Sequence, residues 1–460
     1  MPSIVFDSFK GGLDRRIPQT VGGANVQYVL NNAHITTGGK IRKRPCLLRT
    51  ATLEPGTKGL KAAGGKLNTF YESGTITHAD TRFTPNKVPH PTLSQLVTKA
   101  HYAELFNGFL YCAVEYADGS VFHHYLDGTV PPRVTDVNCP HSKQVEKLSQ
   151  KIYAAAGPNV RFTKTADPRD WTTANDAGSI AAGTQAAGSD TVTAIGEFKS
   201  DLAIFFSDST QVWDVDSDPA NNALKSTADN VGTIYSKCSA TLAGDLIFLA
   251  KQGFRSVSLT ALTNNLQEND VGSAIDKLRN EIADADDPIS VYYPALGQLW
   301  KINGNKAYVY SFARSVKLSA WSVFTFPVTI EAATVLASEL YLRAGDICYI
   351  VDKDTFNDNG VIPVVEVEMF FQDNKSPGML KQFSGYDGVV VGSPQIAFRF
   401  SPNTPVNVTD YIQIEGDMRA GDLFPLEVCA TSIAPIFRHE LDEEFELESL
   451  QLYYNNLSNL

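Results

Sequence analysis

Short apolar runs, each followed by a polar turn and a second mixed run, recur seven times along this chain. The first Leu or Ile of each run lies at Leu67, Leu110, Ile152, Leu202, Leu246, Leu299 and Leu340. Neighbouring positions in this series are separated by 43, 42, 50, 44, 53 and 41 residues. A repeat of roughly 40–50 residues in which each copy supplies two or more strands is typical of a β-propeller. The pattern therefore predicts an all-β fold built on a six-bladed or seven-bladed β-propeller.

The turns inside the repeats support this prediction. Asp118-Gly119-Ser120, Gly157-Pro158-Asn159 and Gln252-Gly253 separate two apolar runs, and such residues tolerate the positive φ angles of tight hairpins. Many runs lack clean alternation of apolar and polar residues, as expected for inner blade strands that pack on both faces. A β-sandwich also contains many short strands, but it does not require a recurring period.

The pattern divides the chain into three parts. Residues 1–60 form an N-terminal segment with Gly-Gly turns and a basic hairpin, residues 61–352 hold the propeller, and residues 353–460 form a β-rich, platform-like C-terminal domain. Longer strand candidates, such as Val364–Phe371 and Glu446–Tyr454, distinguish the C-terminal domain from the repeats. We therefore expect an additional β domain beside the propeller.

One stretch inside the propeller departs from the strand pattern. Residues 269–288 contain apolar residues near helical spacing, with Ser273 at the position of an N-terminal cap. This combination predicts a helix.

Composition narrows the class of protein. The hydrophobic content of 43% and the charged content of 20% are those of an ordinary soluble protein. No run approaches the ~18 apolar residues of a membrane span, and the start of the chain has no secretory signal. The six cysteines include no C-x-x-C pair, so zinc and thioredoxin-like chemistry lack support, while disulfides remain open. We expect a protein that is made in a cytoplasm, with no membrane-spanning segment.

The charge is distributed unevenly. The net charge of −12 disfavours tight binding to nucleic acid, yet residues 1–60 carry nine Lys or Arg against three Asp or Glu, and residues 361–460 carry five against fifteen. The candidate subunit or partner contacts are Lys40, Arg42, Lys43, Arg44 and Arg49 at the basic end and Glu440, Asp442, Glu443 and Glu444 at the acidic end. Contact with DNA and a merely solvated strand face are the alternatives for the basic cluster.

No motif points to catalysis. Asp214, Asp216 and Asp218 have the first spacing of a calcium loop, but Pro219 and Lys225 occupy positions where an EF-hand needs Gly and Glu. Adjacent residues on a strand face opposite sides, so His123 and His124 are poorly placed to share a metal. The chain has no P-loop, no G-x-S-x-G and no H-E-x-x-H. We predict that the protein is not an enzyme, with no catalytic residues, no cofactor and no metal.

Several short motifs, in their order along the chain, resemble those of a known family. They are Phe9-Lys10-Gly11-Gly12-Leu13, Asn31-Asn32-Ala33, Gly39-Lys40-Ile41-Arg42-Lys43-Arg44-Pro45, Val160-Arg161-Phe162 with Asp167-Pro168-Arg169-Asp170-Trp171, Leu246-Ile247-Phe248-Leu249 with Gln252-Gly253-Phe254-Arg255, and Ala320-Trp321-Ser322. Together they resemble the tail hub, or nozzle, proteins of short-tailed bacteriophages, which include packaged-DNA stabilisation proteins. The C-terminal domain is matched least.

The resemblance implies a six-bladed propeller and a homohexameric ring at the distal end of the tail. Such a ring would surround a channel that retains packaged double-stranded DNA and later lets it pass without sequence specificity. Its partners would be upstream tail adaptor proteins and tail fibre, spike, needle or plug proteins, and it would be a virion protein assembled in the bacterial host cytoplasm. The basic start and the acidic end could pair head to tail between subunits.

An enzyme or lectin is the alternative to this structural role. The turn Asp167–Trp171 is similar to the Asp-containing turn of sialidase-like propellers. A propeller glycosidase would need carboxylates that converge at the propeller axis. A propeller glycosidase or glycan-binding lectin therefore remains the second interpretation.

Overall fold

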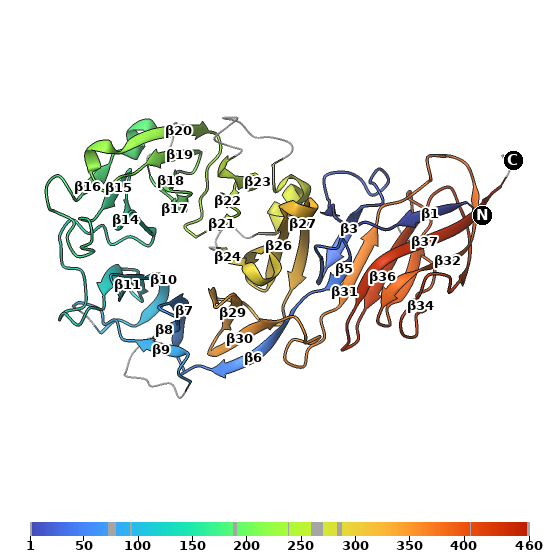
Figure 1. The fold of residues 1–460 in the computed structure, drawn as a ribbon, viewed down its shortest axis with the longest axis horizontal. Coiled ribbons are helices and arrows are strands. Elements are labelled where there is room, and N and C mark those ends of the chain that lie inside the picture. Colours follow the sequence, from blue (N-terminus) through green and yellow to red (C-terminus); the bar gives the residue numbers. More distant parts are fainter. Residues whose placement is uncertain are drawn as a thin grey trace.

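A ring of small sheets and a second β domain beside it make up the protein (Figure 1). This computed structural model describes residues 2–71, 80–92, 94–186, 191–237, 239–258, 270–282, 288–404 and 406–457. The molecule is elongated, and both ends of the chain lie at the tip of the second domain, far from the ring (Figure 1). Nearly all regular structure is β, which confirms the predicted fold class.

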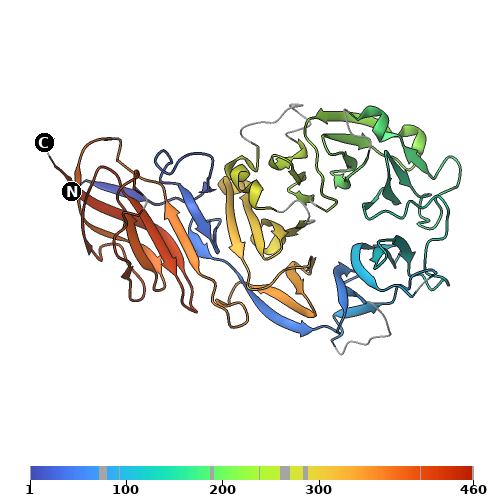
Figure 2. The ribbon, with the colours of Figure 1, turned by 180° about the vertical axis from the view of Figure 1, so that it is seen from behind.

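The ring is a propeller with seven blades among the described residues. Each blade begins with an inner strand: β7 (Thr57–Ala63), β10 (Val97–Phe106), β13 (Val145–Leu148), β17 (Ala194–Phe198), β21 (Ala240–Leu242), β24 (Ile289–Tyr293) and β28 (Ala332–Leu336). Each inner strand contacts the next, and β28 contacts β7, so the ring is closed (Figure 2). The count is seven, the second of the two numbers predicted, whereas the resemblance implied six.

The outer strands follow in sequence order within each blade. They are β8 (Lys66–Tyr71) and β9 (Phe83–Asn86), β11 (Phe109–Tyr116) and β12 (Val121–Tyr125), β14 (Lys151–Ala156), β15 (Asn159–Phe162) and β16 (Gly178–Ile180), β18 (Asp201–Phe205), β19 (Ser209–Asp214) and β20 (Ala223–Asp229), β22 (Asp245–Ala250) and β23 (Gly253–Ser256), β25 (Gln298–Asn303), β26 (Lys306–Ala313) and β27 (Leu318–Thr325), and β29 (Glu339–Ala344) and β30 (Ile347–Asp352). Each of the seven repeat positions is the second residue of the second strand of a blade, and all seven are buried.

The N-terminal part of the chain closes the ring. Strand β6 (Cys46–Thr52) pairs antiparallel with β30 and becomes the outermost strand of the seventh blade. Leu47 of β6 and Val351 of β30 are both buried in one apolar cluster that the sixth and seventh blades share. The closure is therefore made by hydrogen bonds and apolar packing between strands from distant parts of the sequence.

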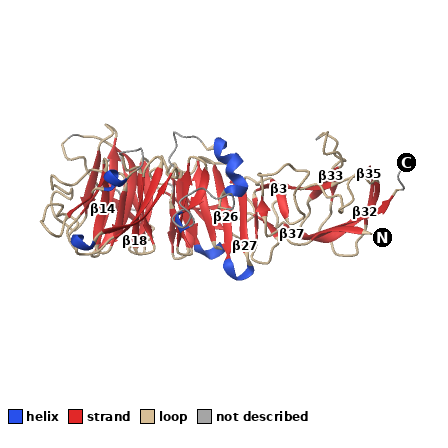
Figure 3. Cartoon of the chain, turned by 90° about the horizontal axis from the view of Figure 1, so that it is seen from above, coloured by secondary structure: helices blue, strands red, loops and turns tan. Residues whose placement is uncertain are grey.

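Five 3₁₀ segments lie wholly within the described residues, and Figure 3 draws the helices in blue. They are η1 (Ala182–Gln185), η2 (Pro219–Asn221), η3 (Ser273–Glu281), η4 (Pro294–Leu296) and η5 (Arg314–Val316). Within the predicted helix 269–288, the helical part is η3, and residues 269 and 283–287 lie outside the described residues. Its N-cap is Gly272, not Ser273, and no side chain caps it. A side chain at 272 would meet the backbone oxygen of Phe254 at 2.3 Å. In the described part of the chain, no helix has the length and apolar character to cross a membrane.

The second domain is a sandwich of two sheets that combines both ends of the chain. Its strands are β1 (Ser3–Phe6), β2 (Gly12–Leu13), β3 (Val26–Asn31), β4 (Ala33–Ile35), β5 (Ile41–Lys43), β31 (Val365–Met369), β32 (Lys381–Val391), β33 (Gln395–Arg399), β34 (Ile412–Gln413), β35 (Phe424–Ala430), β36 (Ala434–His439) and β37 (Glu446–Asn456). The two sheets face each other across an apolar core, where the rings of Tyr386 on β32 and Phe398 on β33 lie 5.2 Å apart.

One sheet belongs to both domains. The sixth blade continues from β27 into β3 through a parallel pairing of Val323 with Asn31, and β3 then pairs antiparallel with β31. The result is a ten-stranded sheet in the order β24-β25-β26-β27-β3-β31-β36-β33-β34, with β2 beside β3. The structure thus distributes residues 1–60 over both domains: β1–β5 lie in the second domain, and β6 and the start of β7 lie in the propeller.

Candidate functional site

Some of the predicted basic residues lie beside the acidic C-terminal segment where the two domains join. Strand β5 carries Arg42 and Lys43 and pairs antiparallel with the start of β37, which places Arg42 opposite Glu446. The acidic residues Glu440, Asp442, Glu443 and Glu444 lie in the connection that follows β36, immediately before β37. The opposite charges of the two ends of the chain therefore lie side by side within one molecule.

Two of the predicted basic residues, Lys40 and Arg42, form three ion pairs at the surface. Lys40 Nζ lies 2.7 Å from Glu446 Oε1 and 2.8 Å from Glu448 Oε2, and hydrogen bonding to these carboxylates raises the pKa of Lys40. Arg42 Nη2 lies 2.7 Å from Glu444 Oε1. Exposed pairs of this kind contribute little to stability because water and salt screen them.

Lys43 is buried against backbone carbonyl groups. Its Nζ donates to the Leu441 carbonyl oxygen at 2.7 Å, and burial lowers the pKa of the Lys43 amine. This lysine therefore fixes the turn between β36 and β37 to β5, and it is not a surface charge.

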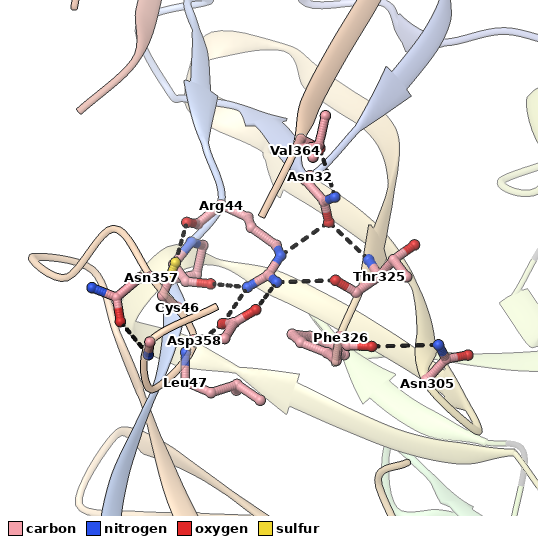
Figure 4. Close-up of polar contacts among 12 residues, drawn as sticks. Asn32, Arg44, Cys46, Leu47, Asn305, Thr325, Phe326, Asn357, Asp358 and Val364 are labelled. Carbon is pink, nitrogen blue, oxygen red and sulfur yellow. Dashed lines mark hydrogen bonds and ion pairs between the residues drawn. The ribbon is translucent and has the colours of Figure 1, made fainter. Parts of the chain in front are cut away.

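Arg44 lies at the centre of the joint, with a side-chain exposure of 0% (Figure 4). Both terminal nitrogens bind Asp358, with Nη1 2.9 Å from Oδ1. The remaining N–H groups donate at 3.0 Å each to Asn32 Oδ1, the Pro45 carbonyl oxygen and the Thr325 carbonyl oxygen. All five donors of the guanidinium are thereby used, and its Cζ lies 4.6 Å from the centroid of the Phe326 ring.

Asp358 and Asn32, the side-chain partners of Arg44, form further hydrogen bonds to the two adjoining blades and to the second domain. Asp358 Oδ1 also accepts from the Leu47 amide at 2.8 Å, which ties it to the seventh blade. Asn32 Oδ1 accepts from the Thr325 amide at 2.8 Å, and its Nδ2 donates to the Val364 carbonyl oxygen at 2.8 Å. Asn32 adopts φ +54°, a left-handed conformation that Asn tolerates better than most residues. This network, here named the domain joint, connects the sixth blade, the seventh blade and the second domain.

The remaining predicted contact residues have partners in the same chain. Arg49 on the exposed face of β6 donates to Thr52 Oγ1, and Glu440 pairs with Arg438 at 2.5 Å. Asp442 accepts from Asn357 Nδ2 at 2.8 Å. Glu443 accepts from the Ser393 amide at 2.7 Å, and Glu444 pairs with Arg42 as described.

These contacts change one expectation. The pairing of the basic start with the acidic end, which the sequence suggested between subunits, is made inside the chain through β5 and β37. The physical reason is that the second domain needs strands from both ends to complete its sheets. Lys43 and Arg44 are buried, so within this chain they act as structural residues.

The motif Asp167–Trp171 has a structural role as well. Arg169 Nη2 lies 2.7 Å from Asp127 Oδ1, and this hydrogen bond lowers the pKa of Asp127. The Trp171 amide donates to Asp136 Oδ2 at 2.8 Å, and its ring is buried. The motif therefore fastens the third blade to the end of the second.

The other polar candidates, Asp218, His123 and His124, form hydrogen bonds with residues close to them in the same blade. Asp218 caps η2 by accepting from the Ala220 amide at 3.0 Å. His123 and His124 point to opposite faces of β12, as expected: His123 Nδ1 lies 2.8 Å from Tyr111 Oη, and His124 Nε2 lies 2.9 Å from Tyr116 Oη. Among the residues that the structure describes, no group of three or more His, Cys, Asp or Glu side chains is arranged to hold a metal ion.

Sequence analysis missed two residues of the joint. Asp358 lies in an Asn-Asp-Asn-Gly turn, which predicts an exposed loop, and nothing in its neighbourhood indicates a buried carboxylate. Asn32 was noted only as part of the family resemblance. Asn32 lies between the buried residues Leu30 and Ala33, and nothing in this local sequence indicates a hydrogen bond with Arg44, twelve residues later.

Comparison with known proteins adds little to this description. No protein-family model and no curated protein matches the sequence. Among solved structures, a chain in the crystal structure of the mitotic checkpoint complex is 12% identical, with a TM-score of 0.36, over 77% of this chain and 96% of its own length. BamB from Moraxella catarrhalis is 10% identical, with a TM-score of 0.37, over 70% of this chain and 83% of its own. The assignment of the propeller rests on the sheet order and the closed ring of inner strands.

Proposed function

We propose that this protein is a structural virion protein, the tail hub or nozzle of a short-tailed bacteriophage. It works as a homohexameric ring around the DNA channel, retains the packaged DNA and allows its ejection. Its partners are the upstream tail adaptor and the fibre, spike, needle or plug proteins, and it is assembled in the host cytoplasm. The net charge of −12 suits a conduit because like charge keeps DNA from adhering.

The domain joint carries this proposal. Asn32 and Arg44-Pro45 belong to the motifs that resemble the hub family, and these same residues build the joint. A closed ring requires that each subunit present two different faces at a fixed angle. A shared ten-stranded sheet and a buried ion pair with all donors satisfied hold the two domains in one such arrangement.

Measuring the assembly tests the proposal. Mass photometry and negative-stain microscopy of the purified full-length chain are expected to show a ring of six copies. Asp358→Asn should weaken the ring because it loosens the joint, whereas Asp354→Asn, at an exposed position in the same loop, should not. A chain that stays monomeric at every concentration and binds or cleaves glycans would refute the proposal.

One observation favours the alternative of a propeller glycosidase or lectin. Glu104, Glu146 and Glu197 all lie on inner strands. Burial, reinforced by Glu104 and Glu197 and opposed by Lys237, raises the pKa of Glu146 to about 7. A carboxyl group with a raised pKa near a second carboxylate is the arrangement of a glycosidase acid. Hydrolysis of a panel of aryl glycosides that disappears in Glu146→Gln would favour this alternative over the hub.

A further inference from the structure

A cleft of about 290 Å³ lies between the neighbouring fifth and sixth blades (Figure 1). The fifth blade contributes lining residues from β21, β22 and β23, and the sixth blade contributes them from β26, η5 and β27. The volume is close to the lower end of the range of about 300–1,000 Å³ that is usual for small-ligand pockets. None of the residues of the domain joint borders this cleft.

Much of the lining is apolar. Leu242 and Ile247 come from the fifth blade, and Tyr310 and Phe312 come from the sixth. The rings of Tyr310 and Phe312 are stacked with their centroids 6.0 Å apart, and Phe312 is half-buried. An apolar wall of this kind holds the hydrocarbon part of a ligand because contact with it removes apolar surface from water.

Asp270 is the most buried charged residue of the lining, with 4% exposure. Its Oδ1 accepts from the amides of Val271 at 2.6 Å and Ser256 at 3.3 Å. Its Oδ2 accepts no hydrogen bond from the residues that the structure describes, and it lies 3.9 Å from Arg255 Nε. Both terminal nitrogens of Arg255 are bound to Asp276 at 2.9 Å. The negative charge of Asp270 is therefore compensated only in part.

A second carboxylate in the lining adds to this negative charge. Burial raises the pKa of Asp270 to about 6, and the charge of Asp245 acts in the same direction. A carboxylate whose charged form is disfavoured in this way is stabilised by a positive charge placed beside it. The Asp270 side of the cleft is therefore suited to an ammonium group.

Arg314 brings a positive charge to the same cleft. It is exposed in η5, and its guanidinium has no ion pair or hydrogen bond with any residue in the described part of the chain. The planar fork of an arginine matches the geometry of a carboxylate better than that of other anions of one charge. The cleft thus combines a buried carboxylate, an apolar wall and an unpaired guanidinium.

We propose that this cleft binds a free apolar α-amino acid, with its ammonium group at Asp270, its side chain against the apolar wall and its carboxylate at Arg314. A ligand with only one charge would leave either Asp270 or Arg314 uncompensated, and a neutral ligand such as a sugar would leave both so. A zwitterion with an apolar side chain satisfies all three parts of the lining. This site is independent of the hub role and of ring formation.

Calorimetric titration of the full-length chain with L-leucine and with L-phenylalanine at pH 7.5 tests the site. Binding of at least one of them with a Kd below about 1 mM is expected. The amide of that amino acid, which lacks the carboxylate, and its N-acetyl derivative, which lacks the ammonium group, should each bind at least about tenfold more weakly. Absence of binding to both amino acids, or equal binding of either blocked derivative, would overturn the proposal.

Two variants and a matched control assign the contacts. Asp270→Asn keeps an oxygen for the amide of Val271 but removes the charge, so it should weaken binding of the amino acid at least about tenfold. Arg314→Gln should weaken binding of the amino acid and leave binding of its amide unchanged, and it should keep the wild-type melting temperature because Arg314 is exposed. Lys317→Gln removes an exposed cation that follows η5 and does not border the cleft, and it should leave binding unchanged. Equal weakening in Arg314→Gln and Lys317→Gln would contradict the assignment of the site.

Discussion

Arg44 and Asp358, which are 314 residues apart in the sequence, form a buried two-point ion pair where the propeller meets the second domain (Figure 4). Removing two charges from water is costly, so a buried pair persists where every remaining donor and acceptor is satisfied. Here Asn32, Pro45 and Thr325 complete the set around the guanidinium. The pair therefore fixes one relative arrangement of the two domains.

Breaking this pair from one side should be strongly destabilising. Asp358→Asn keeps the shape of the side chain but leaves the Arg44 charge buried without compensation, which costs about 3–5 kcal/mol. Urea unfolding should show this loss, and hydrogen exchange at the amides of Leu47 and Thr325 should become faster because both amides belong to the joint.

Two further variants make the measurement specific. Asp354→Asn, which is exposed in the same loop, should change the free energy of unfolding by less than about 0.5 kcal/mol. Arg44→Met combined with Asp358→Leu should recover a large part of the loss, since a buried pair can be replaced by apolar residues at little cost. A loss below about 1 kcal/mol in Asp358→Asn would show that the joint does not depend on the charge.

The exposed pair between Arg42 and Glu444 should behave differently. Arg42→Glu is expected to cost at most about 1 kcal/mol in thermal unfolding, because the pair is screened by solvent. Combining it with Glu444→Arg restores opposite charges and should recover most of that cost. If ring assembly nevertheless weakens in Arg42→Glu and not in the double variant, then this edge of β5 also contacts a neighbouring subunit.

Reversing Arg42, Lys43 and Arg44 together would not test ring formation. Lys43 and Arg44 are buried, so the triple change should unfold the joint before any subunit contact is measured. This is a case where a cluster of like charges in the sequence suggested a surface, because charged residues are rarely buried unless paired. The partner that permits the burial, Asp358, lies too far along the chain to be recognised from local pattern.

The propeller itself was far more accessible to sequence analysis. Its strands pair with their neighbours in sequence. Each blade therefore appears in the sequence as a short series of apolar runs separated by turn residues, as in β11 with Leu110 and β29 with Leu340. The second domain was predicted as β-rich, but its assembly from both ends was not. Pairs such as Arg42 on β5 with Glu446 on β37 have no local signature, because register between distant strands is decided by packing.

A tight turn in the seventh blade should be open to stabilisation. Ala337 and Ser338 connect β28 to β29 with φ angles of +52° and +69°, which non-glycine residues adopt at a cost. Ser338→Gly should therefore raise stability by roughly 0.5–1 kcal/mol, after allowance for the added freedom of the unfolded chain.

The second blade provides the reverse experiment. Gly108 occupies the equivalent turn between β10 and β11 with φ +85°, and an added Cβ there would meet nothing within 4 Å. Gly108→Ser should therefore lower stability through backbone strain alone, by about the same amount. Equal signs for Ser338→Gly and Gly108→Ser in urea unfolding would contradict this account of the turns.

Buried histidines should make the protein less stable in mild acid. Burial lowers the pKa of six of them below the usual value of 6.5: His34 and His123 to about 4, His124 to about 3 and His101 to about 2, with His141 and His439 lowered as well. The unfolded chain takes up these protons at a higher pH than the folded chain does. Each neutral histidine therefore stabilises the fold above pH 6.5. Below pH 6.5, each one lowers the free energy of unfolding by about 1.4 kcal/mol per pH unit. Glu146 and Asp270, whose pKa values are raised to about 7 and about 6, act in the opposite direction. The histidines outnumber them, and the free energy of unfolding should fall between pH 6.5 and pH 5.

His124→Gln isolates one histidine from this balance. The Tyr116 hydroxyl donates to the Val88 carbonyl oxygen and accepts from His124 Nε2. The amide of glutamine can still donate this hydrogen bond, but it takes up no proton. The decrease in unfolding free energy from pH 7.5 to pH 5 should therefore be smaller in the variant than in the wild type by about 2 kcal/mol. Urea unfolding of both chains at the two pH values measures this difference. An unchanged decrease would mean that His124 is protonated as readily in the folded chain as in the unfolded one.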